Sequence, residues 1–209
     1  MTVDEIVRRV RQRSQRLASG LPVPQPPVGS DFSLNGVVPL PERYRPAAVL
    51  VPLVDRAPGL TVLLTQRTED MPSHAGQVAF PGGRRQAEDV DPVATALRET
   101  EEEVGLERRF VDVIGSVDLY RTGTGYEITP VVGIVTPGFT THADPREVAD
   151  VFEVPLEHFL DARNHRIDSR IVAEGRERRY YAMPYGERYI WGATAGMLKN
   201  LHFILTAGD

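Results

Sequence analysis

The sequence predicts an α/β fold in which helices cover a mixed β-sheet. Several short runs rich in β-branched residues are joined by turns that contain glycine or proline, and these runs are interspersed with segments of helical periodicity. Strands and helices mixed in this way indicate layers around a shared core. The chain has 209 residues, of which 41% are hydrophobic, so it is long enough for one well-packed domain.

The strands are expected from residue 45 onward. Residues 47–54 and 60–66 are apolar runs separated by a segment with Pro58 and Gly59, which predicts a hairpin. The remaining predicted strands share the same β-branched character and are bounded by turn residues. They lie at 110–119, 127–135 and 151–154, with a further hairpin at 167–173 and 178–183.

Three segments have the spacing of helices. Residues 92–104 form the clearest one, since apolar residues recur on one side and Gly105 ends the pattern. Residues 190–205 predict a closing helix, and residues 2–19 predict an amphipathic helix with an arginine-rich outer face. A proline-rich stretch follows this first helix. We therefore expect an N-terminal helix and arm over residues 1–44 and a main domain over residues 45–209.

Composition excludes several classes of protein. The net charge of -5 provides no basic field of the kind that attracts nucleic acid. The absence of cysteine excludes disulfides, thiolate metal sites and a cysteine nucleophile. No apolar segment has the length of a signal peptide or a membrane span. The expectation is a cytoplasmic protein without nucleic acid or membrane partners, although the arginines of residues 8–16 leave salt-sensitive binding of nucleic acid as an alternative.

A cluster of glutamates on the helix at 92–104 carries the chemistry. At about 100° per residue, Glu99, Glu102 and Glu103 fall in one sector of the helix, whereas Glu101 points away. Like charges at these spacings oppose helix formation unless a cation lies over them. Mg²⁺ suits such a site because it takes oxygen ligands and often completes its shell with substrate phosphate. The same sequence pattern is also typical of a solvated helix face.

The residues around this cluster resemble a known motif. The run from Gly82 to Leu106 is similar to the Nudix box, G-x5-E-x7-R-E-U-x-E-E-x-G-U, in which U is aliphatic. The matching positions include the whole acidic half of the motif: Arg98, Glu99, Glu102, Glu103, Gly105 and Leu106. Thr100 stands at an aliphatic position, and nine residues instead of seven separate Glu88 from Arg98.

The longer loop is typical of one Nudix subgroup, the coenzyme A diphosphatases. Their upstream signature, roughly L-L-T-x-R-[S/A]-x3-R-x3-G-x3-F-P-G-G, is similar to the segment from Leu63 to Gly83. Thr68 and Pro72 depart from it, and Pro72 replaces an arginine that could contact phosphate. Downstream segments GYEITPVVGIV, EVADVFEVPL and YIWGATAGML also look like this subgroup, so the resemblance extends over residues 45–201.

The resemblance implies the Nudix fold, an α/β/α sandwich with a mixed sheet, and assigns roles. Glu99 and Glu103 would be metal ligands for Mg²⁺ or Mn²⁺, and Glu102 a further ligand or the group that activates water. Arg98 would position a catalytic glutamate. The predicted substrate contacts are Arg67, Gly82 and Gly83. His74 could approach the site, and Glu147 lies in a region where several Nudix enzymes place an additional metal ligand or base. Each of the last two has an alternative as an ordinary turn residue or an exposed helix-start residue.

The predicted reaction is hydrolysis of the diphosphate bridge of coenzyme A or a derivative to 3′,5′-ADP and 4′-phosphopantetheine. Pro72 keeps open another nucleoside diphosphate derivative, such as ADP-ribose, a dinucleotide or a nucleoside triphosphate. A non-catalytic ligand-binding module is a third reading, although such modules usually lose box glutamates. The expected partner is a small-molecule substrate, and a homodimer is left open.

Overall fold

A long parallel pair forms the centre of the sheet. The computed structural model describes residues 1–24, 28, 30–35, 43–71, 74–172 and 175–207. Strand β1 (Arg45–Val54) pairs in parallel with β7 (Tyr126–Val135) over ten residues, while β2 (Thr61–Arg67) pairs antiparallel with the end of β1. The predicted hairpin therefore forms, and the parallel pair makes the sheet mixed.

The other strands of this sheet are short or lie at its edges. The main path runs β3–β2–β1–β7–β5, and β4 joins β1, β6 joins β7 and β8 joins β2, all antiparallel. Their bounds are β3 (Val78–Ala79), β4 (Gly82–Arg84), β5 (Val111–Ser116), β6 (Tyr120–Arg121) and β8 (Val148–Pro155).

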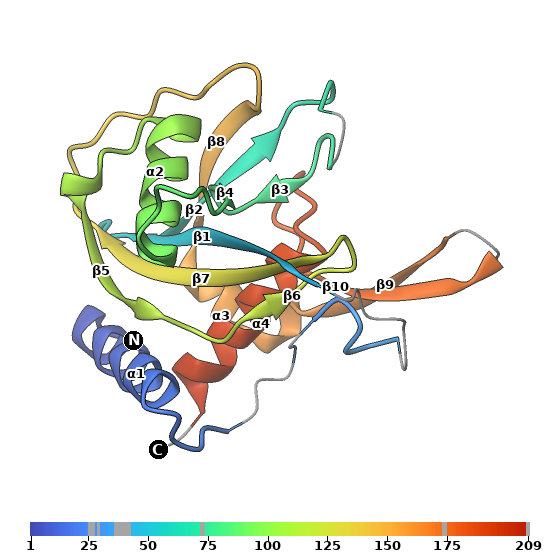
Figure 1. Cartoon of the computed structure of the whole chain (residues 1–209), viewed down its shortest axis with the longest axis horizontal. Coiled ribbons are helices and arrows are strands. Elements are labelled where there is room, and N and C mark those ends of the chain that lie inside the picture. Colours follow the sequence, from blue (N-terminus) through green and yellow to red (C-terminus); the bar gives the residue numbers. More distant parts are fainter. Residues whose placement is uncertain (25–27, 29, 36–42, 72–73, 173–174, 208–209) are drawn as a thin grey trace.

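Helices lie on both faces of the sheet. Helix α2 (Pro92–Val104) covers one face, and α1 (Val3–Ala18), α3 (Leu156–Leu160) and α4 (Ala193–Thr206) lie on the other (Figure 1). Short 3-10 turns occur at Arg108–Phe110 and Ala162–Asn164. The fold is thus the predicted α/β/α sandwich.

The side chains of β1 alternate between two hydrophobic cores, one on each face of the sheet. Val49, Val51 and Leu53 belong to the cluster under α1 and α4, whereas Ala48 and Leu50 belong to the cluster under α2. Successive side chains of a strand point to opposite faces, so a strand that is covered on both sides must be apolar throughout. This explains why the sequence of β1 is an unbroken apolar run.

Four element predictions need correction. The strand predicted over 110–119 ends at Ser116, because its pairing with β7 shifts at Gly115 and the chain then turns so that Asp118 is bound by Arg13. The closing helix begins at Ala193 and not at residue 190, since Gly192 in front of it has a φ of 65°, outside the helical region. Strand β8 is longer than the predicted 151–154, and helix α3 was not predicted.

The N-terminal helix packs on the same core as the sheet. Ile6 and Val10 are fully buried among the residues under α4, and Arg13 forms a buried ion pair with Asp118, with Nε 2.8 Å from Oδ2. The outer arginines also have partners within the chain; the Nε atom of Arg9, for example, lies 2.6 Å from Glu5. Helix α1 is thus held by burial and by charge pairing, and among the described helices none has the length and apolar character needed to cross a bilayer.

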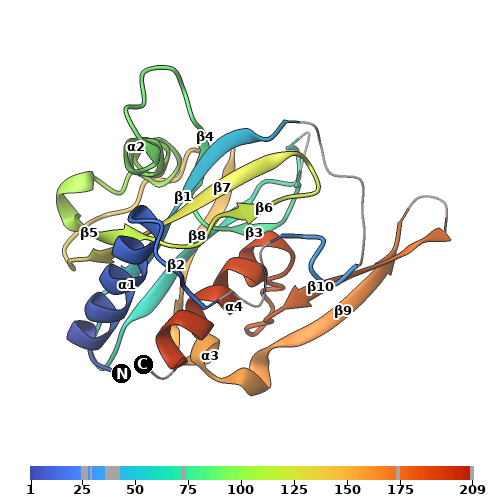
Figure 2. The ribbon, with the colours of Figure 1, turned by 60° about the horizontal axis from the view of Figure 1, so that its bottom comes forward.

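A second sheet projects from the sandwich. Strands β9 (Arg166–Ile171) and β10 (Glu177–Ala182) form an antiparallel hairpin, as predicted from the sequence. Figure 2 shows it extending away from the main sheet, with β10 on the side of α4 and β9 on the far side. The hairpin is therefore an arm of the molecule and not part of its central layers.

Candidate active site

Strong signals at both ends define the helix that presents the glutamates. The Asp91 side chain accepts a hydrogen bond from the Ala94 amide at 2.8 Å, and Pro92 occupies the first turn. Gly105 ends the helix with a φ of 68°, a conformation that glycine adopts without strain. These caps fix which residues share a face, and hence the direction of each glutamate.

All three predicted glutamates reach one pocket. Glu103 is the deepest, with 7% of its side chain exposed, whereas Glu99 has 17% and Glu102 has 58% exposed. Glu101 points elsewhere and pairs with Arg108, as the helical spacing predicts. The pocket is lined by Glu99, Glu102, Glu103, Asp144, Arg146 and Glu147. Of these, Asp144 and Arg146 were not predicted, because they come from a distant loop with no sequence motif.

The Gly82–Gly83 turn holds the two buried glutamates. The Gly82 amide donates to Oε2 of Glu103 at 3.0 Å, and a methyl group at Gly83 would overlap the carboxylate of Glu99. Gly82 also lies so close to β1 that a side chain on Gly82 would overlap the backbone of that strand. In this structure the turn therefore contacts the glutamates themselves, and a substrate contact by Gly82 or Gly83 stays a prediction.

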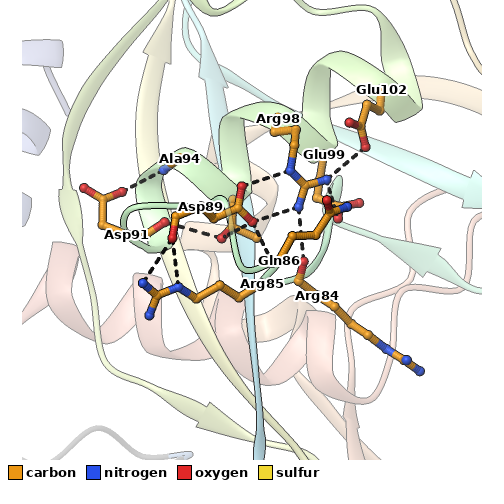
Figure 3. Close-up of polar contacts among 10 residues, drawn as sticks. Arg84, Arg85, Gln86, Asp89, Asp91, Ala94, Arg98, Glu99 and Glu102 are labelled. Carbon is orange, nitrogen blue, oxygen red and sulfur yellow. Dashed lines mark hydrogen bonds and ion pairs between the residues drawn. The ribbon is translucent and has the colours of Figure 1, made fainter.

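Arg98 links the exposed and the buried glutamates (Figure 3). Its Nη1 atom lies 2.9 Å from Oε1 of Glu99 and 3.0 Å from Oε2 of Glu102. Its Nε and Nη2 atoms bind both oxygens of Asp89 at 3.0 and 2.9 Å, and Nη2 also donates to the Arg84 carbonyl. This multidentate geometry uses the planar guanidinium to fix side-chain directions. Arg98 is thus placed to position Glu99 and Glu102.

Asp89 is a site residue that the sequence reasoning missed. It is 7% exposed and accepts hydrogen bonds from the Gln86 amide at 2.9 Å and from the Thr95 hydroxyl at 3.0 Å, in addition to Arg98. Its neighbour Glu88, which the motif spacing selected, is exposed. The signal that could have found Asp89 is the acidic run in the lengthened loop, but the run alone does not show which carboxylate turns inward.

The Asp89 carboxylate makes the free energy of unfolding of the protein depend on pH in the acidic range. Arg98, followed by the Gln86 amide, holds the pKa of Asp89 well below its ordinary value of 3.8. A lowered pKa in the folded state stabilises the protein above the unfolded value, so the contribution is complete above about pH 5 and declines as the pH falls further. We expect the difference in unfolding free energy between wild type and Asp89→Asn, measured with urea, to shrink between pH 5 and pH 3. A difference independent of pH would contradict this role.

Arg67 lies between two carboxylates and is therefore not a free side chain in the pocket. Its Nη1 and Nη2 atoms are each 3.6 Å from an oxygen, the first of Glu103 and the second of Glu147, and its buried Nε has no hydrogen-bond partner among the described residues. His74 sits in a turn with a φ of 59° and contacts Gln77 at 2.9 Å. Pro72 lies outside the described residues. Arg67 and Glu147 thus belong to the site, and His74 belongs to the loop beside it.

Burial changes the acidity of the two inner glutamates. Burial raises the pKa of Glu103 to about 7, opposed by the Gly82 amide and Arg67 and reinforced by the charges of Glu147 and Glu99. Burial also raises the pKa of Glu99, opposed by Arg98. A further positive charge in the pocket would favour the ionised form of both groups.

The donor set fits a hard divalent cation. Among the described histidines, aspartates and glutamates, no three come close enough as they stand to surround an ion. Mg²⁺ does not need such a cage, since it keeps several waters and binds through one or two carboxylates together with substrate phosphates. Glu99 and Glu103, which line the pocket from one helix face, could supply these carboxylates. A pocket of this kind, backed by a glycine turn, is typical of enzymes that bind a divalent cation with a phosphate substrate.

The chain belongs to the Nudix hydrolase family. The family model described as NUDIX domain matches residues 43–174. A protein of Photorhabdus laumondii named an uncharacterized Nudix hydrolase NudL is 42% identical over 163 residues, which make up 78% of this chain and 86% of the relative. A protein of the same name from Citrobacter koseri is 46% identical over 159 residues, 75% of this chain and 81% of the relative. Nudix hydrolases generally use divalent metal ions, in agreement with the donor set.

Solved structures with a similar backbone fold have low sequence identity to this chain. An Ap4A hydrolase of C. elegans in a binary complex matches 53% of this chain and 80% of its own, with 18% identity and a TM-score of 0.45. The NUDIX domain of Shewanella oneidensis NrtR complexed with ADP ribose matches 62% of this chain and 84% of its own, with 20% identity and a TM-score of 0.44. The family assignment rests on the family model and the sequence relatives.

Proposed function

We propose that the protein hydrolyses a diphosphate bridge with the help of Mg²⁺ or Mn²⁺. The observation that carries this proposal is the pocket in which Glu99, Glu102 and Glu103 meet beside the Gly82–Gly83 turn. A bound divalent cation would neutralise charge on the phosphates and help to activate water. Because phosphoryl transfer needs positioning and charge neutralisation more than covalent chemistry, a site of carboxylates and arginines is sufficient for it.

Each of the site residues has a distinct role in the proposed reaction. Glu99 and Glu103 would hold the cation, and Glu102, the most exposed of the three, would take a proton from the attacking water. Arg98 directs Glu99 and Glu102 through the contacts described above. Arg67 turns from its carboxylate partners to a substrate phosphate, since its two ion pairs are long and its Nε is unpaired among the described residues.

The substrate we propose is coenzyme A or an acyl derivative. The support is the resemblance of residues 63–83 to the coenzyme A diphosphatase signature, and the residues of that segment that the structure describes lead directly into the site through Arg67 and the glycine turn. Pro72, which replaces an arginine of the signature, favours the alternative of another nucleoside diphosphate derivative. We expect a small-molecule substrate, a cytoplasmic location and no nucleic acid partner.

A substrate panel tests both the reaction and the substrate. Purified protein is incubated with coenzyme A, ADP-ribose, a dinucleotide and a nucleoside triphosphate, each with Mg²⁺, with Mn²⁺ and with chelator, and the products are separated by chromatography. We expect 3′,5′-ADP from coenzyme A in the presence of either metal. Release of products only from another substrate would remove coenzyme A from the proposal, and no metal-dependent hydrolysis of any substrate would favour a ligand-binding module.

Gly83→Ala should impair the site without unfolding the protein. The added methyl group would displace the Glu99 carboxylate. Since a misplacement of about 1 Å can cost on the order of 100-fold in rate, we expect a fall of that size in kcat. Gly59→Ala is the matched control, because a methyl group there meets open space. The measurement is kcat on the best substrate of the panel, and equal rates for the two variants would contradict the proposed geometry.

A further inference from the structure

The projecting hairpin has one strand edge that the described part of the chain leaves unpaired. Within that part, β9 pairs with β10 and with no other strand. Every β9 residue except Asp168 is exposed, including Ile167 at 46% and Ile171 at 70%. Figure 2 shows β9 on the side of the hairpin that faces away from α4. Exposed strand edges with apolar side chains are templates for pairing with another chain.

The backbone direction of β9 follows from a bond at the end of the hairpin. The Val172 amide donates to the Arg176 carbonyl at 2.8 Å, so Val172 directs its backbone groups toward the partner strand. Because this direction alternates along an antiparallel strand, Ile167, Ser169 and Ile171 direct their N–H and C=O groups outward. Six backbone groups are therefore available on the free edge.

The opposite edge of the hairpin is covered. The Asn35 side chain accepts a hydrogen bond from the Arg179 amide at 2.7 Å and donates to the Arg179 carbonyl at 2.9 Å. The Gly192 amide donates to the Tyr181 carbonyl at 3.0 Å. Arg179 lies opposite Ser169, which confirms that Ser169 faces outward. The fold thus blocks pairing at β10 and leaves it open at β9.

The sequence of β9 is complementary to itself in one antiparallel register. When Ser169 lies opposite Ser169 of a second copy, all three outward-facing residues of each strand are paired. Ile167 then faces Ile171, and Asp168 faces Arg170, each twice by symmetry. Apolar pairs and opposite charges directly across a sheet are both stabilising.

Neighbouring registers are unfavourable. Outward-facing residues must pair with each other, so the strand can shift only in steps that preserve this parity. One step in one direction places Asp168 opposite Asp168 and Arg166 opposite Arg170, and one step in the other places Arg170 opposite Arg170. Like charges in direct opposition destabilise a sheet. The charges of β9 therefore select the symmetric register.

We propose that β9 pairs antiparallel with β9 of a second copy of this chain, which joins the two hairpins into a four-stranded sheet across a two-fold axis. The main-chain bonds of Ile167, Ser169 and Ile171 form the contact, and isoleucines of both copies gather on one face. A symmetric interface of this kind closes on itself and produces a dimer, not a filament. It leaves the carboxylate pocket, which is built on the sandwich, outside the interface.

Ser169→Pro tests the main-chain contact. The Ser169 amide faces away from β10, so proline removes no bond within the hairpin and blocks the centre of the proposed pairing. We expect sedimentation equilibrium of the full chain to show a dimer for wild type and for the matched control Ser169→Ala, and a monomer for Ser169→Pro. Circular dichroism and thermal melting establish that all three are folded. A monomeric wild type at every attainable concentration, or a Ser169→Pro protein that dimerises like Ser169→Ala, would overturn the proposal.

Charge exchange tests the register. D168R and R170D each place like charges opposite one another in their own homodimers, so each alone should weaken the dimer roughly tenfold. Mixed together, the charge introduced at position 168 in one variant faces the charge introduced at position 170 in the other, and affinity should return. The mixture also controls for lost contacts within one chain, such as that of Asp168 with the Tyr189 hydroxyl. A mixture no tighter than either variant alone would overturn the proposed register.

Discussion

Replacing Glu103 with glutamine (Glu103→Gln) is expected to lower kcat on the order of 1,000-fold while leaving the protein folded. The Glu103 carboxylate is the most buried of the three and accepts a hydrogen bond from the Gly82 amide, so its position is the most tightly fixed. Glutamine retains an oxygen for that amide but loses the negative charge. Since burial already raises the pKa of Glu103, removing the charge should not reduce the free energy of unfolding.

The control for this variant lies on the same helix. Glu101→Gln removes a carboxylate of the opposite face, where Glu101 pairs with Arg108 at the surface, and it should change kcat less than twofold. The measurement is initial rate against Mg²⁺ concentration for wild type and both variants, with urea unfolding in parallel. A Glu103→Gln enzyme that keeps most of its Mg²⁺-dependent rate would refute the proposed site.

Replacing Asp89 with alanine should produce the largest loss of stability. The substitution leaves Arg98 without its bidentate partner and removes the acceptor for the Thr95 hydroxyl and the Gln86 amide. Breaking a buried pair on one side costs about 3 kcal/mol, which lowers the melting temperature by roughly 6 to 12 °C for a chain of this size. Activity should fall as well, because Arg98 then no longer holds Glu99 and Glu102 in place.

Asp91→Ala separates this effect from that of helix capping. Asp91 is two residues away and caps α2 through the Ala94 amide, and its loss should cost about 1 kcal/mol. Differential scanning calorimetry and kcat are compared for the two variants. If Asp89→Ala is no less stable than Asp91→Ala, the Arg98–Asp89 pair does not contribute as the structure indicates.

Local signals made much of the fold predictable. Asp91, Pro92 and Gly105 are adjacent to the helix that they delimit, so the bounds of α2 were correct to the residue. The apolar run of β1 indicated a strand, and the turn before β2 indicated a hairpin. The same locality explains the errors. The end of β5 depends on Arg13, more than a hundred positions away, and no local pattern near residue 117 contains that information.

The sequence by itself determined the family of this protein, through its motifs, and the position of three glutamates on one helix face. That position follows from residue spacing within one helix, where geometry is known in advance. Only the tertiary structure decided which charged side chains of the site pair with one another. It showed that Asp89 and not Glu88 holds Arg98, that the glycine turn supports Glu103, and that Arg67 spans Glu103 and Glu147. Such pairings depend on the paths of loops and on packing between segments remote in the chain, which spacing alone does not specify.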